Sequence, residues 1–401
     1  MTADAPDNTE MDSAPSLPGD PAAKTAGKMG SKELMFSLLN GTTRFGASDL
    51  HLKVGYPPYY RVAGHLRKID MPPLENSVFL EEMLAHLVPA ARRHEYDERG
   101  DLDFSYRGAT GDRFRVNIFR ACGEMHSAIR RVQSNIPTFE ELTLPDAYRK
   151  TIEDNHDGLI LVSGVTGSGK SSTLAAMLEH VNVNRSLHII TIEDPIEYVY
   201  QPKKSIISQR EIGIDIPNYA EALRYIVRQD PDVIFIGEMR DKETMLAAIQ
   251  SAETGHLVLG SLHCADAQQT FARILEFFPR DEHDFIRSSL ANSLVAIMCQ
   301  RLLPAAEEGK RVPACEVLLN NATVRDKIRH EEDEDLPAII SSSREEGMCS
   351  FTDSLAELVE RDLVYYDTAL EYAPSREALA SSVKGIKTSS QSLVGRVRSA
   401  R

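Results

Sequence analysis

Residues 164–171 read Gly-Val-Thr-Gly-Ser-Gly-Lys-Ser, which matches the Gly-x-x-x-x-Gly-Lys-Ser pattern of a phosphate-binding loop. An apolar run, Leu159–Ser163, precedes the loop and a helical pattern, Ser171–Asn182, follows it, so a chance glycine-rich turn is the weaker reading. The glycines let backbone N–H groups turn towards an anion, and the helix start adds its positive dipole end. Lys170 is expected to reach the β- and γ-phosphates of ATP, and the Ser171 hydroxyl to hold Mg²⁺. The other residues expected to contact the nucleotide are Gly164, Thr166, Gly167, Ser168, Gly169 and Ser172.

Two further apolar runs end in acidic residues. The run 187–192 ends in Glu193, and the run 232–237 ends in Glu238. Phosphoryl transfer needs metal ligands and a group that orients water, and acids at neighbouring strand ends meet these needs. We expect Glu238 to activate water or to organise Mg²⁺, with Glu193 as its partner, although Gly237 stands where many such enzymes carry a metal-binding Asp. The alternative for both acids is that they cap a strand or open a helix.

Two histidines, His256 and His263, bracket the next apolar run. Histidine at such a position can sense the γ-phosphate or hydrogen-bond a catalytic carboxylate. A capping or core histidine is equally compatible with the pattern, which does not choose between the two readings.

The elements that must position these residues alternate between strand and helix after about Lys150, and the strands are continuous apolar runs. Strands that are buried on both faces of a parallel sheet show this pattern, so we expect a doubly wound α/β core. Upstream, strand-like runs flank helical stretches without regular alternation, which indicates a small α+β domain. The predicted organisation is a disordered lead-in at 1–30, the α+β domain at 31–145, the ATPase core with C-terminal helices at 146–370 and a flexible tail at 371–401.

Composition narrows the class of protein. A hydrophobic fraction of 42% with 26% charged residues is that of an ordinary globular protein. The net charge of −15 argues against nonspecific nucleic-acid binding as the main task. The sequence predicts neither a transmembrane helix nor a secretory signal, and the five cysteines lack the Cys-x-x-Cys spacing of a zinc or redox site. The acidic run Glu331–Asp335 is expected to be a solvated loop, and a last helix is expected over Phe351–Arg361.

Taken in order along the chain, four of these motifs resemble those of a known family. The loop at 164–171, the acidic box Thr191–Glu197, the Gly-Glu at the end of 234–238 and the histidine box 255–263 resemble the ATPases of type II and type IV secretion and of type IV pili. Within that family the chain is similar to the type IV pilus retraction ATPases of the PilT/PilU kind, on Ser48–Leu52 followed by two prolines. The helix-like segment 324–329 resembles a helix linked to retraction in that branch, and the chain lacks the extra N-terminal domain and zinc motif of the assembly ATPases.

The resemblance implies a RecA-like P-loop core preceded by a PAS-like α+β domain. It also implies a homo-hexameric ring in which arginines of the first domain approach the nucleotide, and the matching residues are Arg115 and Arg130. Ordinary surface arginines on edge strands are the alternative. The implied setting is cytoplasmic and peripheral at the inner membrane, with an inner-membrane pilus platform protein and a paralogous retraction ATPase as partners and no nucleic acid.

Three functions fit these motifs. The first is a Mg²⁺-dependent ATPase motor for pilus retraction in twitching motility. The second is a type II/IV secretion or conjugation ATPase, and the third is a nucleotide-binding accessory subunit of a pilus motor.

Overall fold

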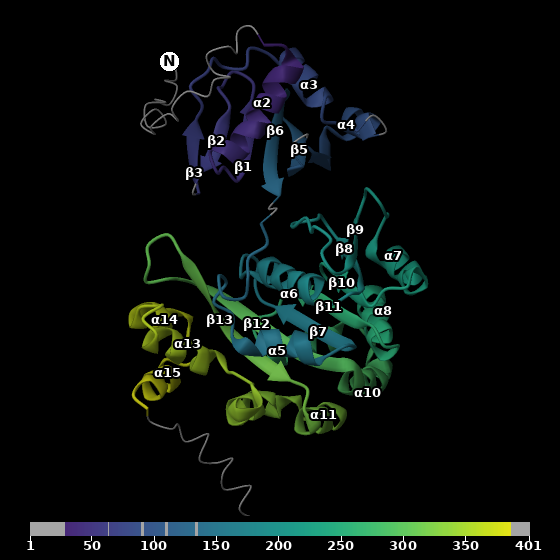
Figure 1. Cartoon of the computed structure of the whole chain (residues 1–401), viewed down its shortest axis with the longest axis vertical. Coiled ribbons are helices and arrows are strands. Elements are labelled where there is room, and N and C mark those ends of the chain that lie inside the picture. Colours follow the sequence, from purple (N-terminus) through teal and green to yellow (C-terminus); the bar gives the residue numbers. More distant parts are fainter. Residues whose placement is uncertain (1–28, 63, 90–91, 109–110, 133–134, 386–401) are drawn as a thin grey trace, which may run out of the picture. The chain divides into compact units, whose positions relative to one another are not determined.

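The computed structural model describes residues 29–62, 64–89, 92–108, 111–132 and 135–385. The chain divides into two compact units: the first comprises the residues up to 134 together with Glu197–Val199, and the second comprises Asn135–Ile196 and the chain from Tyr200 onwards (Figure 1). Each unit encloses its own hydrophobic core. The division lies before the predicted boundary at residue 145, because the intervening segment packs on the second unit, with the Phe139 ring 5.5 Å from the ring of His180. The predicted lead-in lies outside the described residues except for its last two positions.

The first unit is an antiparallel sheet with helices, in the order β3-β2-β1-β6-β5-β4. Its strands are β1 (Asp49–Lys53), β2 (Tyr59–Val62), β3 (His65–Lys68), β4 (Asp101–Arg107), β5 (Arg113–Ala121) and β6 (Glu124–Val132). Its helices are α2 (Ser31–Arg44), α3 (Ser77–Ala85) and α4 (Arg93–Arg99). Burial alternates along β5, where Phe114, Val116 and Ile118 point into the core and the residues between them point outwards. This alternation fixes which side chains the outer face of the sheet presents.

The second unit is built on a seven-stranded sheet in the order β13-β12-β7-β11-β10-β8-β9. Its strands are β7 (Gly158–Ser163), β8 (His188–Glu193), β9 (Ile206–Glu211), β10 (Val233–Ile236), β11 (Leu257–Leu262), β12 (Leu294–Pro304) and β13 (Arg311–Leu319). Neighbours pair in parallel from β12 to β9, and β13 pairs antiparallel with β12. Every residue of β7 and β11 is buried, as expected of strands covered on both faces. The carboxyl ends of β7, β11, β10 and β8 therefore meet at one edge of the sheet.

Helices follow most of these strands. They are α5 (Asp146–Asp154), α6 (Lys170–Asn184), α7 (Tyr219–Ile226), α8 (Lys242–Glu253), α9 (Ala267–Glu276), α10 (His283–Ser293), α11 (Ala322–Arg329), α12 (Leu336–Ser342), α13 (Phe351–Glu360), α14 (Tyr366–Tyr372) and α15 (Arg376–Val383). Single 3₁₀ turns lie at Val227–Gln229, Arg280–Glu282, Asp333–Asp335 and Arg344–Glu346. Side chains that accept a hydrogen bond from the first turn start several helices; Asp241 does so for α8 and Asp266 for α9. None of the described helices combines the length and the apolar character that crossing a membrane requires.

The helix that leaves the phosphate loop is anchored at its far end by Asn182. This side chain is fully buried, donates to the carbonyl of Gln201 at 2.8 Å and accepts from the N–H of Lys203 at 3.0 Å. The Asn182 carbonyl also accepts from the N–H of Lys204 at 2.9 Å. The carboxyl end of α6 is thus joined to the segment that leads into β9.

Two sequence expectations in the C-terminal part need correction. The acidic run Glu331–Asp335 is a solvated loop only in part, because Asp333 begins a 3₁₀ turn and pairs with the nearly buried Arg287 at 2.6 Å, whereas the other four residues are exposed. The chain is not a flexible tail from residue 371 as far as Gly385, since α15 is capped by Ser375, buries Leu379 and lies against α13. The helix predicted at Phe351–Arg361 exists as α13, but α14 and α15 follow it. The rest of the predicted tail, 386–401, lies outside the described residues.

Candidate active site

The phosphate loop connects β7 to α6, as the sequence predicts. Gly164, Gly167 and Gly169 have φ of 155°, 79° and 94°, values that side chains disfavour. A Cβ on Gly164 would lie only 2.4 Å from Ser168 Oγ and 2.6 Å from the carbonyl oxygen of Gln300. The close approach of the chain at this point therefore requires glycine.

Lys170 is the first residue of α6 and is buried, with its amine turned back over the loop. Its Nζ donates to the carbonyl oxygens of Gly164 at 2.7 Å and Val165 at 3.2 Å. Ser168 Oγ is also buried and has no hydrogen-bond partner among the described residues. A buried hydroxyl without a partner, an ammonium group and the start of a helix are the donors that a phosphate group needs. Thr166 and Gly167 form the exposed tip of the loop, and Ser171 and Ser172 lie in the first turn of α6.

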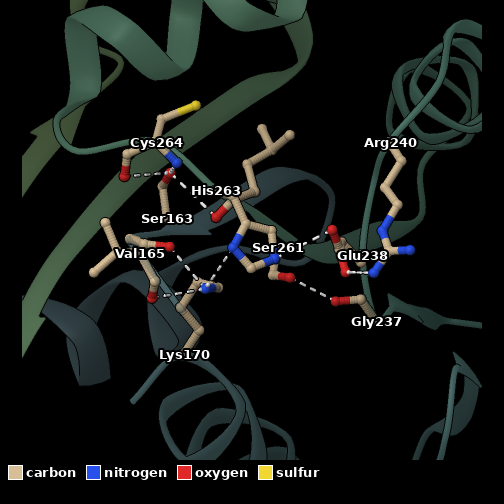
Figure 2. A network of polar contacts seen from close by, with 11 residues as sticks. Ser163, Val165, Lys170, Gly237, Glu238, Arg240, Ser261, His263 and Cys264 are labelled. Atoms are coloured by element: carbon tan, nitrogen blue, oxygen red, sulfur yellow. Dashed lines mark hydrogen bonds and ion pairs between the residues drawn. The ribbon is translucent and has the colours of Figure 1, made fainter. Parts of the chain in front are cut away.

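A chain of polar contacts runs from the phosphate loop to the end of β10 (Figure 2). Lys170 Nζ lies 3.4 Å from His263 Nδ1, and His263 Nε2 lies 3.1 Å from Glu238 Oε1. The other carboxylate oxygen of Glu238 accepts from the guanidinium of Arg240 at 2.6 Å. Figure 2 shows the His263 ring between the lysine amine and the carboxylate. The structure thus brings together Lys170, His263 and Glu238, which the sequence singled out on three separate strand ends.

The partners of His263 determine where its proton lies. An ammonium group can only donate, so Nδ1 accepts from Lys170 and the ring proton is on Nε2, from which it is donated to Glu238. Burial alone would raise the pKa of Glu238, but the hydrogen bonds from Arg240 and His263 and the positive charge of Arg240 outweigh it and hold that pKa below its usual value. Glu238 is therefore a carboxylate, able to accept a proton.

Glu193, at the end of β8, lies at the same edge of the sheet. It is buried, and its Oε1 accepts from Thr191 Oγ1 at 2.6 Å and from Gln209 Nε2 at 3.2 Å. A Cβ on Gly237 would lie 3.3 Å from the Cα of Glu193 and 3.2 Å from the hydroxyl oxygen of Tyr219. The chain therefore leaves little room for a side chain at Gly237.

The structure does not bring His256 to this site. His256 precedes β11, at the strand's amino end, whereas His263 follows its carboxyl end. Its Nδ1 lies 3.0 Å from the Ser251 carbonyl and 3.2 Å from Thr254 Oγ1, at the end of α8. The capping reading fits these contacts, and the catalytic role assigned to His256 finds no support in them.

Arg115 and Arg130 lie directly opposite each other on β5 and β6. Both point to the outer face of the first unit's sheet, away from Phe114 and Ile129. Arg115 pairs with Asp103 at 2.5 Å, and Arg130 with Asp49 at 2.8 Å. Directly opposed residues have Cβ atoms about 5 Å apart, but Asp103 lies on β4 and Asp49 on β1, so the ion pairs draw the two guanidinium groups towards opposite sides of the β5–β6 pair.

Sequence reasoning missed Arg240. The signal available was its spacing, because side chains two apart in an extended segment share a face, and Arg240 comes two residues after Glu238.

Comparisons with known proteins identify the family of the chain. The family model for type II/IV secretion system proteins matches residues 27–354. The chain is 39% identical over 336 residues to the type IV pilus retractation ATPase PilT of Pseudomonas aeruginosa, covering 84% of this chain and 97% of that protein. It is 38% identical over 339 residues to the type IV pilus ATPase PilU of the same organism, covering 84% of this chain and 88% of that protein.

Among solved structures, the pilus retraction motor PilT with bound ADP matches with a TM-score of 0.79 at 39% identity, covering 86% of this chain and 98% of that chain. The predicted family and the α/β fold with a RecA-like core are thereby confirmed. The chain belongs to the type II/IV secretion system protein family and is a nucleotide-binding ATPase of that family.

Proposed function

We propose that this ATPase is the motor subunit that powers type IV pilus retraction, the activity behind twitching motility. The observation that carries the proposal is the continuous contact chain from Lys170 through His263 to Glu238, which joins the phosphate loop to a charged carboxylate. The similarity to two pilus ATPases along most of the chain supports the choice of pili.

ATP would supply the phosphoryl group, and the chain's residues would position it. The loop N–H groups and the Lys170 amine would hold the β- and γ-phosphates. Glu238, kept ionised by Arg240 and His263, would accept the proton of the attacking water. Glu193, at the adjacent strand end, would orient that water with it. His263 would keep the Glu238 carboxylate directed towards the phosphate loop.

The donor set suits Mg²⁺. This cation usually binds only one or two protein oxygens, and water and phosphate oxygens complete its coordination shell. When bound, it would supply Lewis-acid chemistry at the phosphates. The Ser171 hydroxyl in the first turn of α6 would hold it, and the Glu238 carboxylate at the end of β10 would hold it instead if Glu238 is not the base.

The working unit that we propose is a homo-hexameric ring, cytoplasmic and peripheral at the inner membrane. Arg115 and Arg130 would approach the γ-phosphate from the first domain and lose that contact after hydrolysis, so that the domains reopen. The motion would be passed to an inner-membrane platform protein, and a paralogous retraction ATPase is a further proposed partner. In a ring, closure of one subunit biases its neighbour.

The site is tested by Lys170→Ala. Loss of the ammonium group from the β/γ-phosphates should abolish ATP hydrolysis by the purified chain, measured as phosphate release. Lys310→Ala, which removes an exposed lysine in the β12–β13 turn, is the matched control and should hydrolyse ATP normally. Full turnover by Lys170→Ala would refute the assignment of the phosphate site.

The cellular role is tested by deleting the gene and counting surface pili. Retraction predicts more pili and no twitching, restored by the wild-type gene but not by Lys170→Ala. Fewer pili would indicate assembly. Unchanged pili with a loss of protein or DNA export would indicate a secretion or conjugation ATPase.

A further inference from the structure

Ser163 is the last residue of β7 and the last before the phosphate loop, and it is fully buried. Its Oγ accepts from the N–H of Cys264 at 3.1 Å. Its own proton is within reach of the carbonyl oxygens of Cys264 at 3.2 Å and Leu262 at 3.4 Å. One side chain therefore contacts both backbone polar groups of the residue that follows His263, as Figure 2 shows.

The backbone of β7 leaves the sheet directly after Ser163. The parallel register ends where Ser163 pairs with Leu262. The N–H of Gly164 still donates to the Leu262 carbonyl at 3.3 Å, but the chain then turns into the loop. The hydroxyl of Ser163 takes the place of a missing peptide group and extends the β7–β11 ladder by one residue.

A second serine, Ser261, connects the end of β11 to the segment that follows β10. The Ser261 hydroxyl donates to the Gly237 carbonyl at 2.6 Å, and the Ser261 carbonyl accepts from the N–H of Met239 at 3.1 Å. These bonds flank Glu238 in sequence. The end of β11 is thus tied to the phosphate loop on one side and to the segment of Glu238 on the other, with His263 between them.

We propose that Ser163 is a positioning residue for ATP hydrolysis: its hydroxyl fixes the backbone at Cys264 and so holds the His263 ring between Lys170 and Glu238. The inference rests on the proposed roles of His263 and Glu238. Ser163 touches none of the reacting groups, and it acts through the backbone that carries the ring.

The first test is the kinetics of Ser163→Ala in the full chain. Loss of the hydrogen bonds between the Ser163 hydroxyl and the backbone at Cys264 should lower kcat for ATP about tenfold. Because the phosphate loop itself is intact, KM should change by less than about twofold. Ser293→Ala is the matched control, since Ser293 is also buried and makes one hydrogen bond, to the Ser289 carbonyl at 2.8 Å. The control should keep wild-type kcat, whereas an equal loss in both variants would overturn the inference.

The second test asks whether Ser163 acts through His263. In a His263→Ala background, adding Ser163→Ala should change kcat by less than about twofold, because the group that it positions is gone. A further tenfold loss would overturn the inference. Normal turnover of His263→Ala alone would refute the proposed site itself. A slow His263→Ala with a normal Ser163→Ala would refute only the role of Ser163.

A third measurement needs no nucleotide. In protein labelled with ¹⁵N-histidine, the imidazole resonances of His263, assigned by comparison with His263→Gln, report its two ring contacts. The chemical shifts of these resonances should change in Ser163→Ala and should remain unchanged in Ser293→Ala. Unchanged resonances in Ser163→Ala would contradict the proposed positioning.

Discussion

Glu316 on β13 should make the stability of this protein fall as the pH rises. Burial and the nearby charge of Asp266 raise its pKa from 4.5 to about 7, despite the hydrogen bond that its Oε1 accepts from the N–H of Ala267 at 2.8 Å. An acid whose pKa is raised in the folded state contributes stability below its unfolded pKa and loses that contribution as the pH rises through the folded value. The affected window runs from about pH 4.5 to about pH 7.

The shift corresponds to at most about 3 kcal/mol, because each pKa unit is worth 1.36 kcal/mol. Glu316→Gln removes the charge and keeps an oxygen that can accept from Ala267. The variant should therefore be more stable than the wild type at pH 8, by up to that amount, and about equal to it at pH 4.5.

The assay is urea unfolding of the full chain between pH 4.5 and pH 8, followed by far-UV circular dichroism. Glu308→Gln, which changes an exposed glutamate in the β12–β13 turn, is the control and should follow the wild-type profile. If the wild type and Glu316→Gln lose stability in parallel between pH 4.5 and pH 7, Glu316 is not the group responsible and the reasoning fails.

Three further changes test the site and the C-terminal part. Glu238→Gln should bind ATP but lower turnover at least about a hundredfold, because the proton acceptor is lost; normal phosphate release would exclude Glu238 as the base. Gly237→Ala should destabilise the chain by about 1 kcal/mol in urea unfolding, since its Cβ would meet the Tyr219 hydroxyl at 3.2 Å, and no change would mean that the strand end yields freely. Asp333→Asn should lower stability by about 2–3 kcal/mol by leaving the buried Arg287 without its charged partner, and an unchanged urea midpoint would restore the reading of this run as a solvated loop.

The parts of the fold that follow from local sequence were predictable. The helices α8 and α9 start at Asp241 and Asp266, which cap them, and β7 and β11 are continuous apolar runs, so their positions could be predicted within a residue or two. The short strand His65–Lys68 and the edge strand Ile206–Glu211 lack such a pattern, since one is mostly charged and the other partly polar. These two segments form strands because they pair with neighbouring strands of the sheet. The local sequence pattern does not contain that information.

The site was predictable as a set of strand ends but not as a set of contacts. His256 and His263 look equivalent as the two ends of one apolar run, and only the strand's direction in the sheet separates them. Likewise, the acidic run hides the pairing of Asp333 with Arg287, since these residues are far apart in the chain. One charge of a largely exposed run thus pairs with a nearly buried arginine.

The anchoring of α6 has a mechanical consequence. A helix of 15 residues is a nearly incompressible rod about 22 Å long. Its amino end carries Lys170, and its carboxyl end is fastened through Asn182 to the segment before β9. If phosphate contacts displaced the amino end, the helix would carry that displacement to residues 201–204, which lead into the edge strand β9.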